Sequence, residues 1–343
     1  MSTVPFSRLA SPLEIGGVSL RNRVFLAPMS GVTDLPFRLR AHGHGAGLVV
    51  SEMVASGELA KGRDESIRRI RRRPEIDVHM VQIAGRDRIW MAEAARIAAD
   101  AGADIIDINM GCPAKKVTGG YSGSALMREP DHALSLIEAV VRAVQVPVTV
   151  KMRLGWDEDC LNAPQIARRA EDAGIAMVTV HGRTRCQFYK GRADWRAIAR
   201  VKEAVSIPVV ANGDGAGRRE AEAMLQQSGA DAIMIGRAHY GAPWAAGALV
   251  HEAAGTGDAG VPRDGAARAA YIVSHYRDML SHYGEAQGVR HARKHLGWYF
   301  DRFAGEGLAP LRARMMTETD PAAVERLLLG IYQEQPVPGR LVA

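Results

Sequence analysis

The sequence predicts a (βα)₈ (TIM) barrel followed by a small all-helical domain. Short apolar runs alternate with segments of helical periodicity. The runs are apolar at consecutive positions, as strands buried on both faces of a parallel sheet must be. Eight strand–helix alternations over about 220 residues match the size of such a barrel. The eight runs are residues 23–27, 47–51, 78–84, 104–109, 147–152, 176–181, 208–212 and 231–235.

Helical periodicity fills the intervals between many of these runs. Three helix-to-strand junctions carry a glycine (Gly102, Gly174 and Gly229) where a helix C-cap needs positive φ. A doubly wound open sheet is the alternative architecture, and it is disfavoured because no G-x-G-x-x-G segment follows the first run. The expected helices include residues 89–101, 132–144, 163–173, 195–204 and 218–227.

The pattern changes after the eighth run. A glycine-rich segment, residues 255–262, leads into three helical stretches without strand signal: residues 266–283, 289–303 and 322–333. We therefore expect a barrel domain over residues 1–250 and a helical domain over residues 251–343. From residue 250 onward there are eleven Lys/Arg and eleven Asp/Glu residues, so this second domain is not basic overall.

Composition limits the class of protein. Three cysteines, Cys112, Cys160 and Cys186, are too few for a disulfide framework, and no C-x-x-C pair suggests a metal site. The first twenty residues lack a leader pattern, and no apolar stretch reaches the ~18 residues of a membrane span. We expect a cytoplasmic monomer that holds no metal and does not contact a membrane.

Basic residues are clustered. The net charge of +6 and the pI of about 9.4 permit a polyanionic partner without requiring one. A solvated surface explains any one cluster, but four clusters, two of them near strand ends, favour a polyanion. The clusters are Arg68, Arg69, Arg71, Arg72 and Arg73; Lys115 and Lys116; Arg183, Arg185, Lys190 and Arg192; and Arg290, His291, Arg293, Lys294 and His295.

Polar or glycine residues stand where the apolar runs end, which is where the active site of such a barrel lies. The seventh and eighth runs end in glycine-rich turns, Asn212-Gly213-Asp214-Gly215 and Gly236-Arg237. Two such turns at the usual phosphate position of this fold predict a mononucleotide phosphate site, and two ordinary tight turns are the alternative.

Four further residues at strand ends are candidates for chemistry. Lys151 ends an apolar run, where a charge needs a reason, although a rim lysine that reaches solvent is the alternative. Gln82 and His181 are candidate cofactor ligands, with ordinary rim hydrogen bonds as their alternative. Cys112 follows the fourth run, and because an unperturbed thiol is protonated at neutral pH it suits a general acid better than a nucleophile. A small buried hydrophobe is the default reading of a cysteine.

Together these segments resemble the tRNA-dihydrouridine synthases, most closely their DusB-like bacterial branch, over roughly residues 15 to 335. The most specific segment is Asn-Met-Gly-Cys-Pro-Ala-Lys-Lys-Val at 109–117, with Gly-Ser-Ala-Leu at 123–126. The other matching segments are Ala-Pro-Met-Ser-Gly-Val-Thr-Asp at 27–34, Lys-Met-Arg-Leu-Gly-Trp at 151–156, Val-His-Gly-Arg-Thr-Arg at 180–185, Ala-Asn-Gly-Asp at 211–214, Met-Ile-Gly-Arg-Ala at 234–238 and Arg-His-Ala-Arg-Lys-His-Leu-Gly-Trp-Tyr at 290–299.

The resemblance implies reduction of the C5=C6 bond of uridines in tRNA, with FMN as cofactor and NADPH as reductant. It assigns the proton-donor role to Cys112 and makes the helical domain a tRNA-binding domain. Cofactor contacts are implied for Pro28, Met29, Ser30, Gln82, Lys151, His181, Asn212, Gly213, Asp214, Gly236 and Arg237. Expected tRNA contacts are Asn109, Lys115, Arg183, Arg185, Arg290, Arg293 and Lys294.

One segment departs from the family pattern, and two other functions stay open. Residues 118–121, Thr-Gly-Gly-Tyr, lack the basic character expected of this loop, which puts its RNA contacts in doubt. A flavin barrel acting on a free pyrimidine, as dihydroorotate dehydrogenases do, is one alternative. The basic clusters and the appended helices disfavour it. A flavin-free RNA-binding protein is the other, and the complete set of rim residues disfavours it.

Overall fold

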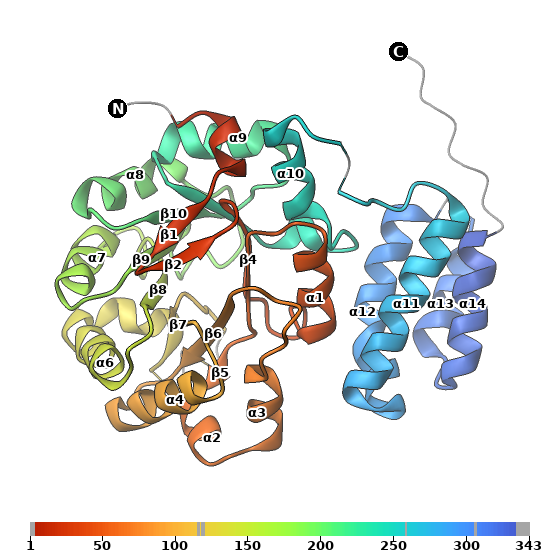
Figure 1. Cartoon of the computed structure of the whole chain (residues 1–343), viewed down its shortest axis with the longest axis horizontal. Helices are drawn as coiled ribbons and strands as arrows, with labels where there is room; N and C mark the ends of the chain where they lie inside the picture. The colour runs from red at the N-terminus through yellow and green to blue at the C-terminus, as the bar shows by residue number, and fades with distance from the viewer. Residues whose placement is uncertain (1–3, 115–116, 118–120, 258, 305–306, 334–343) are drawn as a thin grey trace.

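Eight parallel strands close into a barrel in the described part of the chain. The structure, a computed structural model, describes residues 4–114, 117, 121–257, 259–304 and 307–333. β3 pairs with β4 on one side and with β11 on the other, which closes the ring (Figure 1). Each strand overlaps one of the eight predicted runs, so the predicted barrel is confirmed. The strands are β3 (Val24–Leu26), β4 (Leu48–Val50), β6 (His79–Ala84), β7 (Ile105–Met110), β8 (Val148–Arg153), β9 (Met177–His181), β10 (Val209–Asn212) and β11 (Ala232–Ile235).

The predicted barrel helices are confirmed, with ends that differ by at most two residues from the expected ones. Some of them begin at an aspartate cap that the sequence carries: the carboxylate of Asp87, for example, accepts hydrogen bonds from the backbone N–H groups of Ile89 and Trp90. Gly102, Gly174 and Gly229 all have the expected positive φ. The helices are α1 (Leu35–Gly43), α2 (Ser56–Ala60), α3 (Asp64–Ile70), α4 (Arg88–Asp100), α6 (Pro130–Ala143), α7 (Ala163–Asp172), α8 (Trp195–Ala204), α9 (Arg218–Ser228) and α10 (Ala245–Ala254).

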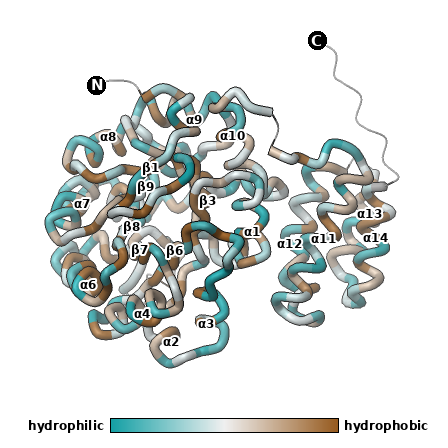
Figure 2. Tube along the Cα trace, in the orientation of Figure 1, coloured by the Kyte–Doolittle hydropathy of each residue, from teal (hydrophilic) through white to brown (hydrophobic). Residues whose placement is uncertain are grey.

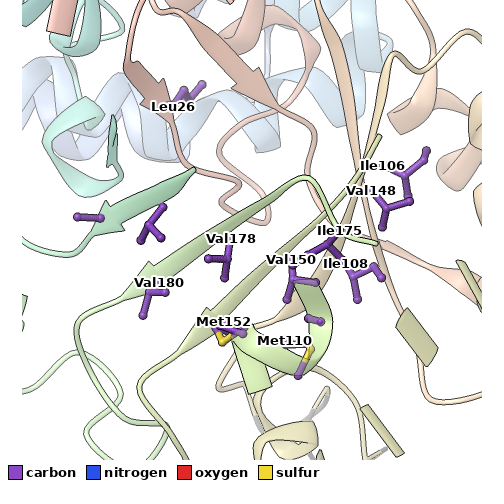
Figure 3. Close-up of a cluster of buried hydrophobic side chains, with 14 of the residues drawn as sticks. Leu26, Ile106, Ile108, Met110, Val148, Val150, Met152, Ile175, Val178 and Val180 are labelled. Carbon is purple, nitrogen blue, oxygen red and sulfur yellow. The ribbon is translucent and has the colours of Figure 1, made fainter. Parts of the chain in front are cut away.

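Side chains alternate between two environments along each strand. On β7, Ile106, Ile108 and Met110 belong to the apolar layer between the strands and the surrounding helices (Figure 3). Asp107 and Asn109 lie between them in sequence and therefore point to the barrel interior. Towards the carboxyl end of this strand, the period of two thus places apolar packing outside the sheet and polar side chains inside it.

The amino-terminal end of the barrel interior is filled by hydrophobic side chains. Phe25, Met80 and Val210 pack there against a two-stranded hairpin of β1 (Leu13–Ile15) and β2 (Val18–Leu20). The hairpin was not predicted, because two strands of three residues give too short a pattern to recognise. It closes one end of the barrel and leaves the carboxyl ends of the strands for polar residues.

In the described residues that follow the barrel there are four helices: α11 (Gly265–Tyr283), α12 (Glu285–Phe303), α13 (Ala309–Thr317) and α14 (Pro321–Gln333). They enclose a hydrophobic cluster of their own and stand beside the barrel near α1 (Figures 1 and 2). Three of them were predicted, and α13, which buries little more than Met315, was not. The expected boundary at residue 250 falls within α10, a helix that packs against β3 of the barrel.

The helical domain is fastened to the barrel by polar and aromatic contacts. Arg40 Nη2 lies 2.5 Å from Asp278 Oδ2, and the rings of Tyr240 and Trp298 are stacked with centroids 3.9 Å apart. At Gly241, which has a φ of +66°, a β-carbon would lie 2.4 Å from the carbonyl oxygen of Trp298. A side chain at this position would therefore push the two domains apart.

Within the described residues, no helix is long and apolar enough to cross a membrane. The same part of the chain contains no group of three or more His, Cys, Asp or Glu side chains arranged to hold a metal ion.

Candidate functional site

A cavity of about 1000 Å³ opens at the carboxyl ends of the barrel strands. Every residue for which a cofactor contact was expected lines it, and so do Cys112 and Asn109. Strand register brings these residues together: Asn109 lies opposite Lys151 on neighbouring strands, and His181 lies opposite Asn212. Residues scattered between positions 28 and 237 of the sequence thus meet in one site.

Lys151 supplies a buried positive charge in the cavity. Its side chain projects inward from β8, and Nζ donates a hydrogen bond to Asn212 Oδ1 at 3.0 Å. Asn212 is itself held by a bond from Nδ2 to the carbonyl oxygen of Met234. Burial, reinforced by the charge of Arg153, lowers the pKa of Lys151 to about 8. The ammonium group is therefore mostly protonated at neutral pH, yet it can lose its proton within the range of enzyme assays.

A chain of buried hydrogen bonds fixes Gln82 and Asn109. Gln82 Nε2 donates to Asp107 Oδ2 at 2.6 Å, and Gln82 Oε1 accepts from Asn109 Nδ2 at 2.7 Å. Thr149 Oγ1 donates to the other carboxylate oxygen of Asp107. Because a carboxylate only accepts, Asp107 sets which way the Gln82 amide faces, and the Gln82 oxygen in turn orients Asn109.

Asn109 holds the loop that carries Cys112. Its Oδ1 accepts hydrogen bonds from the backbone N–H groups of Gly111 and Cys112, at 3.2 and 3.0 Å. Asn109 was expected to contact RNA. The structure instead uses its oxygen to shape the loop, and most of its side chain is buried, with a 7% exposed fraction.

The loop is also fixed from its far side. Cys112 is half-buried and lines the cavity, and its carbonyl oxygen accepts hydrogen bonds from the backbone N–H and the hydroxyl of Ser124. Gly123 has a φ of +61°, and a β-carbon there would lie 2.8 Å from the Cys112 carbonyl oxygen. This contact explains why the Gly-Ser-Ala-Leu segment accompanies the cysteine motif.

Near the expected phosphate site, Asp214 is turned towards arginine side chains. Its carboxylate accepts hydrogen bonds from Arg183 Nη2 at 2.6 Å and from Arg237 Nη2 at 3.0 Å. Burial by itself would raise the pKa of Asp214, but these partners and the backbone N–H of Ala193 outweigh it and lower the pKa. Asp214 therefore remains an anion that positions Arg237, and the bare backbone at Gly213 and Gly236 lines the same end of the cavity.

His181 is a neutral imidazole in the cavity wall. Burial and the charges of Lys151, Arg153, Arg183 and Arg237 hold its pKa well below 6.5. Its Nε2 lies 3.3 Å from Arg183 Nη1. Because a guanidinium group only donates, Nε2 accepts, and the ring proton resides on Nδ1.

Arg183 is not placed to contact RNA, contrary to expectation. Its side chain is 2% exposed and pairs with Asp214. It also donates to the carbonyl oxygens of Lys190 and Gly191, so it holds the backbone of the loop after β9. The sequence could not show this, because an arginine buried by ion pairing has the same local pattern as an exposed one.

The other expected RNA contacts occupy different settings. Arg185 packs over the rings of Trp156 and Phe188. Arg293 donates to the carbonyl oxygens of Thr317 and Glu318 at the end of α13. Arg290 is exposed on α12, Lys294 is close to Gly31 of the barrel, and Lys115 lies outside the described residues.

Two further residues of the cavity were missed from the sequence. Arg153 donates to the carbonyl oxygens of Gly111, Thr184 and Phe188, which ties the cysteine loop to the loop after β9. The Tyr189 ring is half-exposed above the guanidinium groups of Arg153 and Arg237. Arg153 follows Lys151 by two positions, so the period of two could have placed it on the same inward face.

Comparison with known proteins agrees with this geometry. The family model described as "Dihydrouridine synthase (Dus)" matches residues 25–334. A "Probable tRNA-dihydrouridine synthase" of Rhizobium leguminosarum bv. phaseoli is 59% identical over 329 residues, covering 95% of this chain and 100% of the relative. "tRNA-dihydrouridine synthase B" of Xanthomonas axonopodis pv. citri (strain 306) is 50% identical over 287 residues, covering 84% and 86%.

Solved structures share the barrel at low sequence identity. A 2-naphthoyl-CoA reductase complex superimposes with a TM-score of 0.59 at 12% identity, over 76% of this chain and 55% of that one. The old yellow enzyme from Trypanosoma cruzi gives a TM-score of 0.54 at 14% identity, over 72% and 93%. At these identities the likeness concerns the fold alone.

Proposed function

Because the chain belongs to the dihydrouridine synthase family, whose members are flavin-dependent oxidoreductases, we propose that it reduces the C5=C6 bond of uridines in tRNA, with FMN as cofactor and NADPH as reductant. The observation that carries the proposal is the meeting of Lys151, Gln82, Asn109 and Cys112 in one cavity of the barrel. A tRNA substrate would place the activity in the cytoplasm.

The cavity fits a flavin mononucleotide. Its volume of about 1000 Å³ is at the upper end of the ~300–1,000 Å³ typical of ligand sites. Gly236 leaves free space, since a β-carbon there would meet no atom closer than the Met29 sulfur at 3.6 Å. Gly213, Gly236 and Arg237 would hold the phosphate, and Asp214 would orient Arg237. Pro28, Met29, Ser30, Gln82, Lys151, His181 and Asn212 would surround the ring.

When bound, FMN supplies the hydride that NADPH has delivered to it. Lys151 would provide a fixed cation to the bound cofactor. Cys112 donates a proton to C5 of the uracil ring, and Asn109 and Ser124 hold its backbone in place while it does so. Asp107 serves through Gln82 as a positioning residue.

The uracil ring must leave its stack in the RNA to reach this cavity. The Tyr189 ring lines the cavity and suits a flat ring, because it offers an aromatic face. Arg185, Arg290, Lys294 and Lys115 remain proposed contacts to the tRNA, whereas Arg183 is withdrawn from that role by its burial.

Complementation of cells that lack this gene tests the proposal. The wild-type chain should restore dihydrouridine in tRNA, and the purified protein should be yellow. Cys112→Ala should keep its FMN and lose about 10²–10⁴-fold of the tRNA reduction rate, the usual contribution of a general acid. Cys186→Ala, which removes the exposed cysteine, is the control and should behave as wild type. Absence of dihydrouridine with the wild-type chain would refute the function, and unchanged turnover of Cys112→Ala would refute the role of the thiol.

A further inference from the structure

A second cavity lies between the barrel and the helical domain. Its volume is about 250 Å³, and side chains of α1 and α3 face those of α11 and α12 across it. It is a neighbour of the main cavity: Gly31 and Glu52 line the small one, whereas Ser30 and Met53, next to them in sequence, line the large one. A ligand in the small cavity would therefore sit beside the substrate of the large one.

The acidic side chains that line this cavity are already engaged. Glu65 Oε1 lies 2.5 Å from Arg69 Nη2, and Glu52 accepts a hydrogen bond from the backbone N–H of Gly31. Glu52 is also 4.0 Å from Arg69 Nε. Arg69 thus pairs with both carboxylates, and the charges of Glu52 and Asp34 also act on the guanidinium group of Arg38.

Two further cations, Arg38 and Arg68, line the cavity, and Lys294 lies next to Gly31, which also lines it. Arg68 lies over the Tyr283 ring at 5.1 Å, and Lys294 Nζ would be only 2.7 Å from a β-carbon at Gly31. Arg38 lines the cavity and is 1% exposed. No ion pair joins any of the three to a carboxylate within the described ranges.

Arg38 is the most informative of them. Its Nη2 donates to the carbonyl oxygen of Arg69, but Nε and Nη1 find no acceptor among the described residues. A buried guanidinium group with two unmatched donors is costly unless an anion or water completes its shell. Burial lowers the pKa of Arg38 to about 10, so the group remains charged at neutral pH.

We propose that this interdomain cavity binds a phosphate group, held by Arg38, Arg68 and Lys294 from both domains. The N–H groups of a guanidinium can donate paired hydrogen bonds to the oxygens of a phosphate. A cavity that could hold several water molecules, at ~30 Å³ each, is also large enough for a phosphate group. The origin of this phosphate rests on the proposed function. We assign it to the backbone of the tRNA, next to the uridine that enters the large cavity.

Inorganic phosphate is the first probe, applied to the FMN-loaded protein so that the cofactor's own phosphate site is filled. Phosphate should raise the melting temperature of the wild type more than chloride at equal ionic strength. The difference between the melting temperatures in phosphate and in chloride should be smaller in Arg68→Gln. Because the Arg68 side chain is only half-buried, this variant should still fold. Arg200→Gln on α8, an exposed arginine on the far side of the barrel, removes the same charge and should keep the wild-type response.

The source of the phosphate is tested with a tRNA transcript at several salt concentrations. Loss of one phosphate contact should lower the slope of log Kd against log salt by about 0.7–1 in Arg68→Gln and in Lys294→Gln, and leave it unchanged in Arg200→Gln. A raised KM for NADPH with an unchanged slope would overturn the assignment to RNA.

Equal responses to phosphate and chloride would overturn the site itself. Because the melting experiment needs no tRNA, it is decided separately from the proposed reaction. A protein that fails to reduce tRNA can still show, or fail to show, the phosphate response.

Discussion

Lys151 is the residue whose charge depends most directly on its surroundings. Burial on the inner face of β8 lowers the pKa of its ammonium group to about 8, and Asn212 Oδ1 accepts one of its protons. The proposed role needs the cation. Its proton is therefore lost within a pH range in which most enzymes are still folded.

We expect kcat/KM for tRNA to fall as the pH rises through about 8, because this parameter reports groups of the free enzyme. Lys151→Arg keeps a charge at alkaline pH and should move the fall to higher pH, at the cost of a lower maximum rate because the guanidinium group is larger. Lys202→Arg, which conserves the ion pair with Asp231, is the control. An unshifted profile in Lys151→Arg would show that another group sets the alkaline limb.

Other residues of the site act through their neighbours. Asp107 fixes the amide of Gln82, Gln82 fixes Asn109, and Asn109 fixes the backbone of Cys112. Each bond by itself contributes about 0.5–1.5 kcal/mol, but an unmatched donor in this buried chain would cost about 1–3 kcal/mol. The cysteine is thus placed by a carboxylate, that of Asp107, which does not itself line the cavity.

At the scale of elements, the loop after β7 is held between a strand and a short 3₁₀ helix, η2 (Gly123–Arg128). Ser124 of this helix donates twice to the Cys112 carbonyl oxygen, and Gly123 lets the two segments approach. The fit requires both a left-handed backbone and the absence of a β-carbon, so the position combines conformational and steric demands.

We predict that Gly123→Ala displaces the cysteine loop and lowers kcat for tRNA reduction at least ten-fold, while FMN remains bound. The backbone strain by itself is worth roughly 1–2 kcal/mol of stability. Gly62→Ala isolates that part, because Gly62 also has positive φ (+69°) but a β-carbon there would meet no atom within 4 Å. The kcat values and unfolding midpoints of both variants separate the effect of the backbone strain from that of the contact with Cys112. Equal effects on kcat would mean that the contact with Cys112 is irrelevant.

At the scale of the whole molecule, the junction of the two domains contains buried histidines. The Phe37 ring of α1 is surrounded by His239 of the barrel and by His275 and His295 of the helical domain, with ring centroids 6.3, 6.0 and 5.4 Å away. Burial, together with the smaller effect of the Lys294 charge, lowers the pKa of His295 to about 3. All three rings must therefore be neutral for the domains to dock.

This arrangement predicts a loss of stability in acid. The unfolded chain binds protons on these histidines below about pH 6.5 and the folded chain does not, so stability is present above pH 6.5 and decreases as the pH falls. For His295 the decrease reaches about 2 kcal/mol at pH 5.

His295→Gln should lack that part of the decrease, as measured by urea unfolding at pH 7.5 and pH 5. Asp34, whose pKa burial raises to about 7, acts in the opposite sense, but it is common to wild type and variant and cancels in their difference. His132→Gln, on α6, is the control. A difference between His295→Gln and wild type that does not change with pH would contradict the prediction.

The local pattern of residues located the barrel strands and several residues of the cavity, and the family resemblance supplied others, such as Pro28, Met29 and Ser30. Apolar strand runs, the alternation of side chains along a strand and glycine turns each depend on residues within a few positions of one another. Such local patterns can be recognised directly in a sequence. Lys151, His181 and Asn212 could be assigned to one rim because the carboxyl ends of parallel strands in a closed barrel meet at one end.

Only the tertiary structure decided how those residues pair. The burial of Arg183 behind Asp214, the use of Asn109 to hold the cysteine loop, and the cations around the interdomain cavity all join segments far apart in sequence. Charge and hydrogen-bond partners across such distances are set by how the sheet closes and where the helical domain docks. A one-dimensional pattern has no signal for either, and so basic clusters that look alike in sequence differ in their burial and in their partners.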